Sequence, residues 1–313
     1  MTTRKAHGDS LQRAITDEAF RALGFPADGW VRRLFGPLMG PAANRLANLA
    51  ASFDQDLTNF GISETARRYL PRFIDRMTVC GTQNIHADGP LLIVSNHPGT
   101  LDGFVIISNL PRDDLKLIIS GVPFVQALPA ASKYLIYTPA DAQLRIKTVR
   151  AAIRHLENGG VLLIFPTGIL DPDPAFLPGA YNALGDWSPS LEIFLRKVPQ
   201  TRVLVTIVSG VLSPSCLRNP LTRLRKEFWQ QQRIAEYIQV IQMMFFAKKF
   251  NLTPKVTFGE PLTTSELLAA GSPDSIMSAI IDRARQVLGI HTTSTGCLAD
   301  ENRQSQYLSK LSK

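Results

Sequence analysis

Cysteine is scarce in this sequence, with only Cys80, Cys216 and Cys297 among its 313 residues. These cysteines are few, widely spaced and odd in number, which argues against a disulfide framework and against the clustered ligands of a zinc site. We therefore expect no metal site. A chain with so little cysteine fits a reducing compartment such as the cytosol.

Long apolar runs are also missing. No uninterrupted run approaches the ~20 residues that cross a bilayer as a helix. Residues 1–30 carry charges throughout and lack the apolar stretch of a secretory signal peptide. We therefore expect neither a signal peptide nor a transmembrane span. Contact with lipid would come from the surface, and we expect a cytoplasmic protein that is peripheral on the cytoplasmic face of a membrane.

The sequence has no acidic excess, because its formal net charge is +8 with a charged fraction of 19% and an apolar fraction of 45%. Such fractions are typical of globular proteins rather than disordered ones. A basic chain is attracted to anionic membranes, nucleic acids and acidic ligands alike. Neither zinc-finger spacing nor the aromatic string of an RNA-binding motif is present, so we expect no nucleic-acid partner.

The segment 91–102 is the most informative part of the chain. Its apolar start, Leu-Leu-Ile-Val, predicts a buried strand, and Pro98 and Gly99 predict a tight turn directly after His97. Asp102 then lies near the start of the next element, where it can bind one nitrogen of the imidazole and leave the other free to accept a proton. The structural alternative is that Asp102 only caps a helix and has no part in catalysis.

The string Asn-His-Pro-Gly-Thr-Leu-Asp at 96–102 resembles the first motif of the phospholipid and glycerol acyltransferase family, Asn-His-x4-Asp. A second apolar run, 161–165, ends in Phe-Pro-Thr-Gly and resembles the family's Phe-Pro-Glu-Gly motif. Gly81 and Asn84, together with the segment 258–261, resemble the borders of the family. The resemblance covers residues 76–262. It implies that His97 is the general base and that Asp102 orients it.

The resemblance also implies substrate contacts and shows where this chain differs. Thr167 stands in place of the usual glutamate, the segment 134–138 offers no arginine for an acceptor phosphate, and Ser209 and Gly210 alter the late Val-Pro motif. These differences weaken the expectation of a glycerol-phosphate acceptor and leave the acyl chemistry intact. Arg145 and Lys147 are the nearest cations. The residues expected to contact substrates are Asn96, Gly99, Thr100, Phe165, Pro166, Thr167, Gly168 and Arg145.

Hydrophobic periodicity predicts an α/β sheet with covering helices. The resemblance implies a mixed, mostly parallel sheet covered by helices, of the kind that glycerol-3-phosphate acyltransferases have. The predicted strands are 76–82, 91–95, 115–119, 134–138, 161–165, 202–208 and 255–258. We expect an N-terminal helical region over 1–75, an acyltransferase core over 76–262, a C-terminal helical segment over 263–290 and a flexible tail over 291–313. A helix is expected from Asp141, its N-cap, to about residue 158.

Two segments are candidates for contact with lipid. The helix predicted from Pro220 to about Asn251 belongs to the segment 218–249, which has 7 basic and 2 acidic side chains beside several aromatic ones. It is either a core helix or a surface that binds an anionic membrane. The apolar patch 30–38 is either part of a helical layer, with the face of Leu46, Leu49, Phe53, Leu57 and Phe60, or a monotopic anchor.

These observations predict an O-acyltransferase that resembles 1-acylglycerol-3-phosphate acyltransferases. Acyl-CoA or acyl-carrier protein is the expected thioester co-substrate, a lysophospholipid or glycerolipid-like hydroxyl is the expected acceptor, and no cofactor is expected. No Gly-x-Ser-x-Gly elbow supplies a nucleophilic serine, so the acceptor hydroxyl attacks directly. Backbone N–H groups of the turn 98–100, or of the helix start after it, would bind the oxyanion. A catalytically silent lipid-binding relative and a hydrolase are the alternatives.

Overall fold

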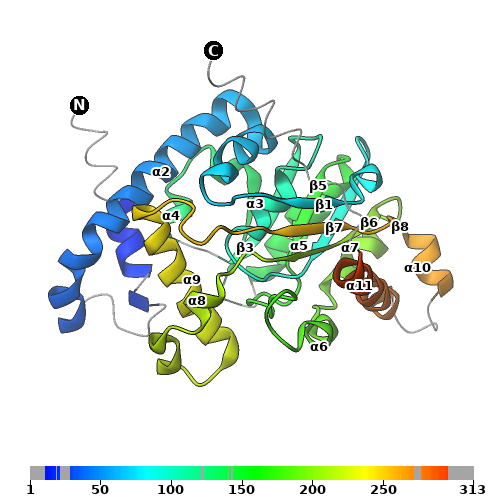
Figure 1. Ribbon diagram of the computed structural model, residues 1–313. Coiled ribbons are helices and arrows are strands. Elements are labelled where there is room, and N and C mark those ends of the chain that lie inside the picture. The colour runs from blue at the N-terminus through cyan, green and yellow to red at the C-terminus, as the bar shows by residue number, and fades with distance from the viewer. Residues whose placement is uncertain are drawn as a thin grey trace, which may run out of the picture.

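A mixed sheet forms the centre of the molecule (Figure 1). The computed structural model describes residues 11–18, 20–21, 29–120, 123–139, 141, 144–270 and 276–294. The sheet has eight strands in the order β1-β7-β6-β2-β5-β3-β4, and β8 pairs with β6 outside this path. Their bounds are β1 Thr78–Cys80, β2 Leu91–Ser95, β3 Leu115–Ser120, β4 Leu135–Thr138, β5 Val161–Ile164, β6 Arg202–Ser209, β7 Lys255–Phe258 and β8 Leu262–Thr263.

Most strand pairs are parallel. β6, β2, β5, β3 and β4 run in one direction. β7 and β8 pair with β6 in the antiparallel sense, and β1 runs parallel to β7. The predicted mixed, mostly parallel sheet is therefore confirmed, and each predicted strand coincides with an observed one. The additional strand, β8, is too short to leave a periodic pattern in the sequence.

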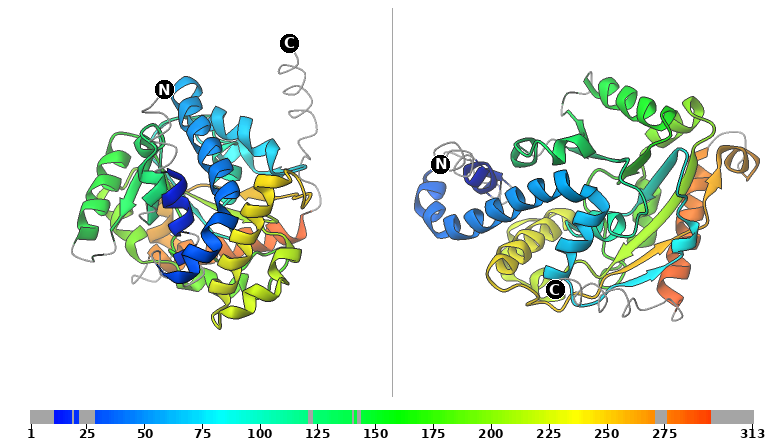
Figure 2. Two further views of the ribbon diagram at one scale, coloured as in Figure 1. Left: turned by 90° about the vertical axis from the view of Figure 1, so that its left-hand side faces the viewer. Right: turned by 90° about the horizontal axis from the view of Figure 1, so that it is seen from above.

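Helices cover both faces of the sheet, as the view from above shows (Figure 2). On β2, Leu91 and Ile93 face one apolar core while Leu92 and Val94 face the other, so the strand is buried on both sides. The first core contains side chains of α2 (Trp30–Tyr69), α3 (Asp102–Ile107) and α9 (Phe228–Phe245). The second contains side chains of α5 (Arg145–Glu157), α7 (Ser190–Lys197), α10 (Thr264–Ala270) and α11 (Ile276–Thr293). Short helices complete the chain: α4 Pro123–Gln126, α6 Ala180–Ala183 and α8 Pro214–Leu217.

The N-terminal region forms the predicted helical layer. Residues 11–18 are helical, and α2 extends for 40 residues before it ends at Tyr69. On its predicted apolar face Leu57 is buried and Phe53 packs against the core, but Phe60 is 39% exposed. The Phe60 ring instead lies beneath the Arg68 guanidinium, 3.6 Å from the ring centroid. α2 is broken at Gly61, whose φ of 75° and ψ of 176° are not helical, and its buried apolar side continues beyond the break with Ile62 and Ala66. Most side chains of the predicted patch 30–38 lie outside those the structure describes.

The helix predicted from Pro220 to about Asn251 was wrong at both ends. α9 ends at Phe245, and beyond it Lys248 and Asn251 have positive φ values that an α-helix does not allow. The chain forms a 3-10 turn over Pro220–Leu224 and begins the α-helix α9 only at Phe228. Between them, Arg225 and Glu227 have extended backbone angles, and the side chain of Gln231 donates to the carbonyl of Arg225 at 2.8 Å. The side chain of Asn219 accepts the N–H of Leu221 at 3.0 Å, which favours the tight turn over a helix.

Two other boundaries differ from expectation. The C-terminal helical segment expected to end at residue 290 is longer, because α11 continues to Thr293. His291 is buried between Thr257 and Ser209, each of which lies 2.8 Å from a ring nitrogen, and this contact holds the last turn of the helix. The expected boundary at 262/263 falls inside β8. The remainder of the predicted tail lies outside the described residues.

The state of the cysteines also differs from expectation. Cys216 is a buried free thiol, but Cys80 is disulfide-bonded. Spacing along a sequence does not show which thiols meet in a fold, so scarcity of cysteine was a poor guide here. Among the described residues, no helix combines the length with the apolar character that a bilayer crossing requires.

Candidate active site

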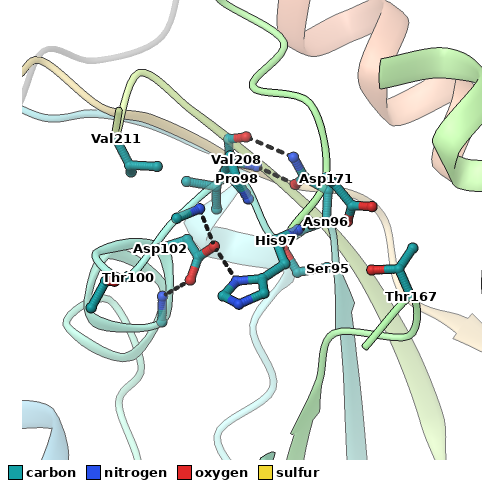
Figure 3. A network of polar contacts seen from close by, with 12 residues as sticks. Ser95, Asn96, His97, Pro98, Thr100, Asp102, Thr167, Asp171, Val208 and Val211 are labelled. Carbon is teal, nitrogen blue, oxygen red and sulfur yellow. Dashed lines mark hydrogen bonds and ion pairs between the residues drawn. The ribbon is translucent and has the colours of Figure 1, made fainter. Parts of the chain in front are cut away.

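The parallel arrangement of β2, β5 and β6 brings three polar loops together at the carboxyl ends of these strands. Ligands of open α/β sheets bind at this edge. Asn96, the first residue after β2, ties the loop after β2 to the strand β6. Its amide donates to the carbonyl of Val208 at 2.9 Å and accepts the N–H of Val208 at 2.8 Å (Figure 3).

His97 follows directly and makes the contact that the sequence predicts. Its Nδ1 lies 2.7 Å from Oδ2 of Asp102, the first residue of α3. The carboxylate also accepts the backbone N–H of Gly99 at 3.1 Å and that of Gly103 at 2.5 Å. The side chain of Asp102 is 2% exposed and that of His97 is 29% exposed. The carboxylate is therefore fixed from inside, while the imidazole reaches the surface of the site.

The second motif packs against this imidazole. The rings of Phe165 and His97 are stacked, with centroids 4.5 Å apart and planes inclined by 23°. Pro166 is buried, and Gly168 turns the chain with a φ of 68°. Thr167 is partly exposed, and its hydroxyl donates to the carbonyl of Ile169 at 2.9 Å. The two motifs, far apart in sequence, thus form one site.

Asp171 and Asp173, which sequence reasoning missed, hold the loops in place. The N–H of His97 donates to the Asp171 carboxylate at 2.8 Å, and the N–H of Asp171 donates to the carbonyl of His97 at 2.8 Å. Asp173 is fully buried and accepts the N–H groups of Ala175, Gly210 and Val211. The string Asp-Pro-Asp at 171–173, directly after the second motif, is a signal that could have been noticed.

A further carboxylate comes from α9. Oε1 of Glu236 accepts both the backbone N–H of Thr100 and, at 2.5 Å, its hydroxyl. The N–H groups of Gly99 and Gly103 donate to Asp102, so each of these predicted oxyanion donors already binds a carboxylate. The expected oxyanion site at this turn is therefore not open in the structure.

The carboxylates control the charge of His97. Burial lowers the pKa of the imidazole, but the negative charges of Asp102, Glu236 and Asp171 outweigh burial and raise the pKa to about 9. Burial in turn raises the pKa of Asp171 to about 6 and also raises the pKa of Glu236. The site thus stabilises the protonated imidazole. This suits a general base, because a base carries the proton once it has taken it from a hydroxyl.

The remaining predicted contacts are only partly brought together. Asn96 is 3% exposed and both ends of its amide bind Val208, so its observed part is structural and its contact with substrate stays a prediction. Gly99 is buried against Val211 and Glu236. Thr100 is exposed at the rim. Arg145 is exposed at the first turn of α5, and its contact with an acceptor stays a prediction.

Comparison with known proteins addresses the central segment. Residues 76–184 match the family model "Acyltransferase", and this range contains both motifs. The chain is also similar to the crystal structure of the 1-acyl-sn-glycerophosphate (LPA) acyltransferase PlsC from Thermotoga maritima, at 14% identity and a TM-score of 0.45. That similarity covers 80% of this chain and 82% of the other. A search of curated proteins found no match.

Proposed function

We propose that this chain, whose residues 76–184 belong to the acyltransferase family, moves a fatty acyl group from a thioester to the hydroxyl of a lysophospholipid or glycerolipid-like acceptor. The observation that carries the proposal is the pairing of His97 with Asp102 at 2.7 Å. This contact binds Nδ1 and leaves Nε2 of a partly exposed ring to meet a substrate. An orienting carboxylate of this kind is typical of a general base.

In the proposed reaction, Nε2 of His97 removes the proton of the acceptor hydroxyl as its oxygen attacks the thioester carbonyl. The new C–O ester bond forms, the C–S bond breaks, and the imidazolium returns the proton to the leaving thiolate. Asp102 keeps the second proton of the ring on Nδ1 and stabilises the positive charge between these steps. A positioned general base of this kind contributes about 10²- to 10⁴-fold to a rate.

The choice of acceptor rests on the charges of the side chains around His97. Thr167 supplies a hydroxyl but no charge, and the charged groups that act on His97 are the carboxylates of Asp102, Glu236 and Asp171. Among the described residues, no Lys or Arg forms an ion pair with these carboxylates. Lysophosphatidate is the first acceptor to test as the commonest in the family, and lysolipids or amino-acid lipids without a phosphate monoester are the second group.

The experiment that tests this proposal is a screen of acceptors. The purified full chain is incubated with isotope-labelled acyl-CoA, or with acyl-carrier protein bearing the same acyl group, and a panel of lyso-lipids. Mass spectrometry then reads both acylated lipid and free fatty acid. Labelled acyl groups on a lipid hydroxyl support the proposal. Free fatty acid as the sole product favours the hydrolase alternative, and consumption of neither donor favours a silent lipid-binding relative.

We propose the segment 218–249 as the surface that meets an anionic membrane on its cytoplasmic face. Apolar side chains of this segment are exposed: Leu221, Leu224, Phe228, Phe245 and Phe246. Phe246 is 63% exposed and Leu224 is 61% exposed, and the seven basic residues of the segment add attraction of ~1 kcal/mol each at an anionic surface.

Vesicle flotation tests this surface directly. The wild-type chain is expected to float with vesicles that contain anionic lipid and to remain below those of zwitterionic lipid alone. Phe246→Ser is expected to weaken flotation, because it removes an exposed ring beside the Lys249 ammonium, 5.5 Å from the ring centroid. Phe176→Ser is the matched control, since Phe176 is 45% exposed outside this segment. Equal flotation of both variants and wild type would contradict the assignment.

A further inference from the structure

The helix α9 turns a polar stripe toward the active site. Gln232, Glu236 and Gln239 are spaced by four and three residues, which places their side chains on one face of a helix. Gln232 is fully buried and Gln239 is 3% exposed. Buried polar side chains are costly unless they are hydrogen-bonded, so a stripe of this kind needs partners.

The two glutamines of the stripe bind the site loops. The amide of Gln232 donates to the carbonyl of Pro98 at 3.0 Å and to that of Asp171 at 2.7 Å, so it joins the loop after β2 to the loop after β5. Gln239 accepts an N–H at 2.6 Å and donates to a carbonyl at 2.9 Å within the loop 211–213 that follows β6. One helix face therefore fastens the loops of all three strands.

Glu236 lies between these glutamines and meets the turn that carries the base. Its Oε1 accepts both the N–H and the hydroxyl of Thr100. A Cβ at Gly99 would lie 3.2 Å from the same oxygen, so the carboxylate is packed directly against the turn. We propose that Glu236 is a positioning residue of the active site, which holds the turn 98–100 and thereby fixes the imidazole of His97.

The proposal places a second, independent support on the base. Asp102 fixes His97 from within the first motif, while Glu236 fixes the turn between them from a helix outside the matched segment 76–184. The charged groups acting on Glu236 are His97 and Asp102. On its own helix, Arg233 is engaged with Glu18 at 3.4 Å. The negative charge of Glu236 also raises the pKa of His97, so charge and position can be separated experimentally.

Two substitutions separate the charge of Glu236 from its hydrogen bonds to Thr100. In Glu236→Gln the amide oxygen can still accept both donors of Thr100, so the turn stays in place while the charge is lost. In Glu236→Ala both the charge and the acceptor are lost. Glu157→Gln is the matched control, because Glu157 is an exposed carboxylate at the end of α5, outside both the site and the segment 218–249.

The kinetic readout rests on the proposed function. Glu236→Ala is expected to lower kcat about 10- to 100-fold with a smaller change in KM, since a small displacement of a catalytic group costs this much. Glu236→Gln is expected to keep kcat within about threefold, with the acid limb of its pH profile moved to lower pH. Glu157→Gln should match wild type. Wild-type kcat in Glu236→Ala, or equal losses of kcat in Glu236→Ala and Glu236→Gln, would overturn the positioning role.

A readout without catalysis distinguishes failure of this inference from failure of the proposed function. The imidazole of His97 is titrated by NMR in the full-length free protein, with His97→Gln to assign its signals. Glu236→Gln and Glu236→Ala should both lower the midpoint of the titration, and Glu157→Gln should leave it unchanged. Only Glu236→Ala should also change the chemical shifts of the imidazole, because only this variant releases the turn. Identical His97 spectra for Glu236→Ala and Glu236→Gln overturn the inference even where no acyl transfer is detected.

Discussion

Replacing Asp102 by asparagine tests whether the carboxylate sets the tautomer of His97. The substitution exchanges one carboxylate oxygen for an NH₂ group. The carboxylate accepts three donors: the ring nitrogen of His97 at 2.7 Å, the N–H of Gly99 at 3.1 Å and the N–H of Gly103 at 2.5 Å. Asparagine offers one acceptor oxygen and an NH₂ group, so in either orientation the NH₂ faces a former donor. When it faces the imidazole, Nδ1 must accept and the ring proton moves to Nε2.

An imidazole protonated on Nε2 cannot take a proton from the acceptor hydroxyl. We therefore expect Asp102→Asn to lower kcat by about 10²- to 10⁴-fold, the full contribution of a general base. In barrier height this is about 3 to 5.5 kcal/mol. In the other orientation the N–H of Gly103 loses its acceptor, which costs about 1 to 3 kcal/mol of folding stability. The loss of the Asp102 charge also lowers the pKa of His97.

The assay measures initial rates of lipid acylation at saturating donor and acceptor for wild type and Asp102→Asn, with urea unfolding of both. Asp88→Asn is the control, because Asp88 is an exposed loop residue. A fall in kcat far larger than any change in folded fraction agrees with the reasoning. Wild-type kcat in Asp102→Asn would refute it, because the carboxylate would then have no part in holding the tautomer.

Further predictions concern pH and stability. Because burial and neighbouring carboxylates set the pKa of His97 at about 9, kcat/KM should rise about tenfold per pH unit up to about pH 9 and then level. The raised pKa also means that stability from this residue is present below pH 6.5 and is lost as pH rises through about 9, which urea unfolding across that range measures. Asp173→Ala should lower the free energy of unfolding by about 3 to 5 kcal/mol, since backbone N–H groups lose a buried acceptor. Gly81→Ala should lower Tm far more than Gly89→Ala, since both have positive φ but a Cβ at Gly81 collides with the carbonyl of Phe258.

The sheet could be predicted because its signals are local. Each buried run, such as Leu91–Ser95, is followed within a few residues by proline or glycine, and runs of four to eight apolar residues suit strands buried on both faces. The contact between His97 and Asp102 could be predicted for the same reason. The two residues are only five positions apart, at the two ends of one short loop.

The rest of the site depends on contacts between distant segments. Asp171 meets the N–H of His97 across 74 residues, and Glu236 meets Thr100 across 136 residues. No periodicity links such positions, because they meet only through the order of strands and the path of α9. The stripe of Gln232, Glu236 and Gln239 was hidden by the basic and aromatic residues of its own helix, which suggested an outward-facing surface.

The most direct test of the account compares wild type with His97→Ala in the formation of acylated lipid from a labelled thioester. Both proteins must show the same cooperative unfolding, so that the comparison reports chemistry. The account predicts that loss of the imidazole lowers the rate of lipid acylation by at least about 100-fold. Equal rates of acylated-lipid formation by the two proteins would contradict the claim that His97 is the base.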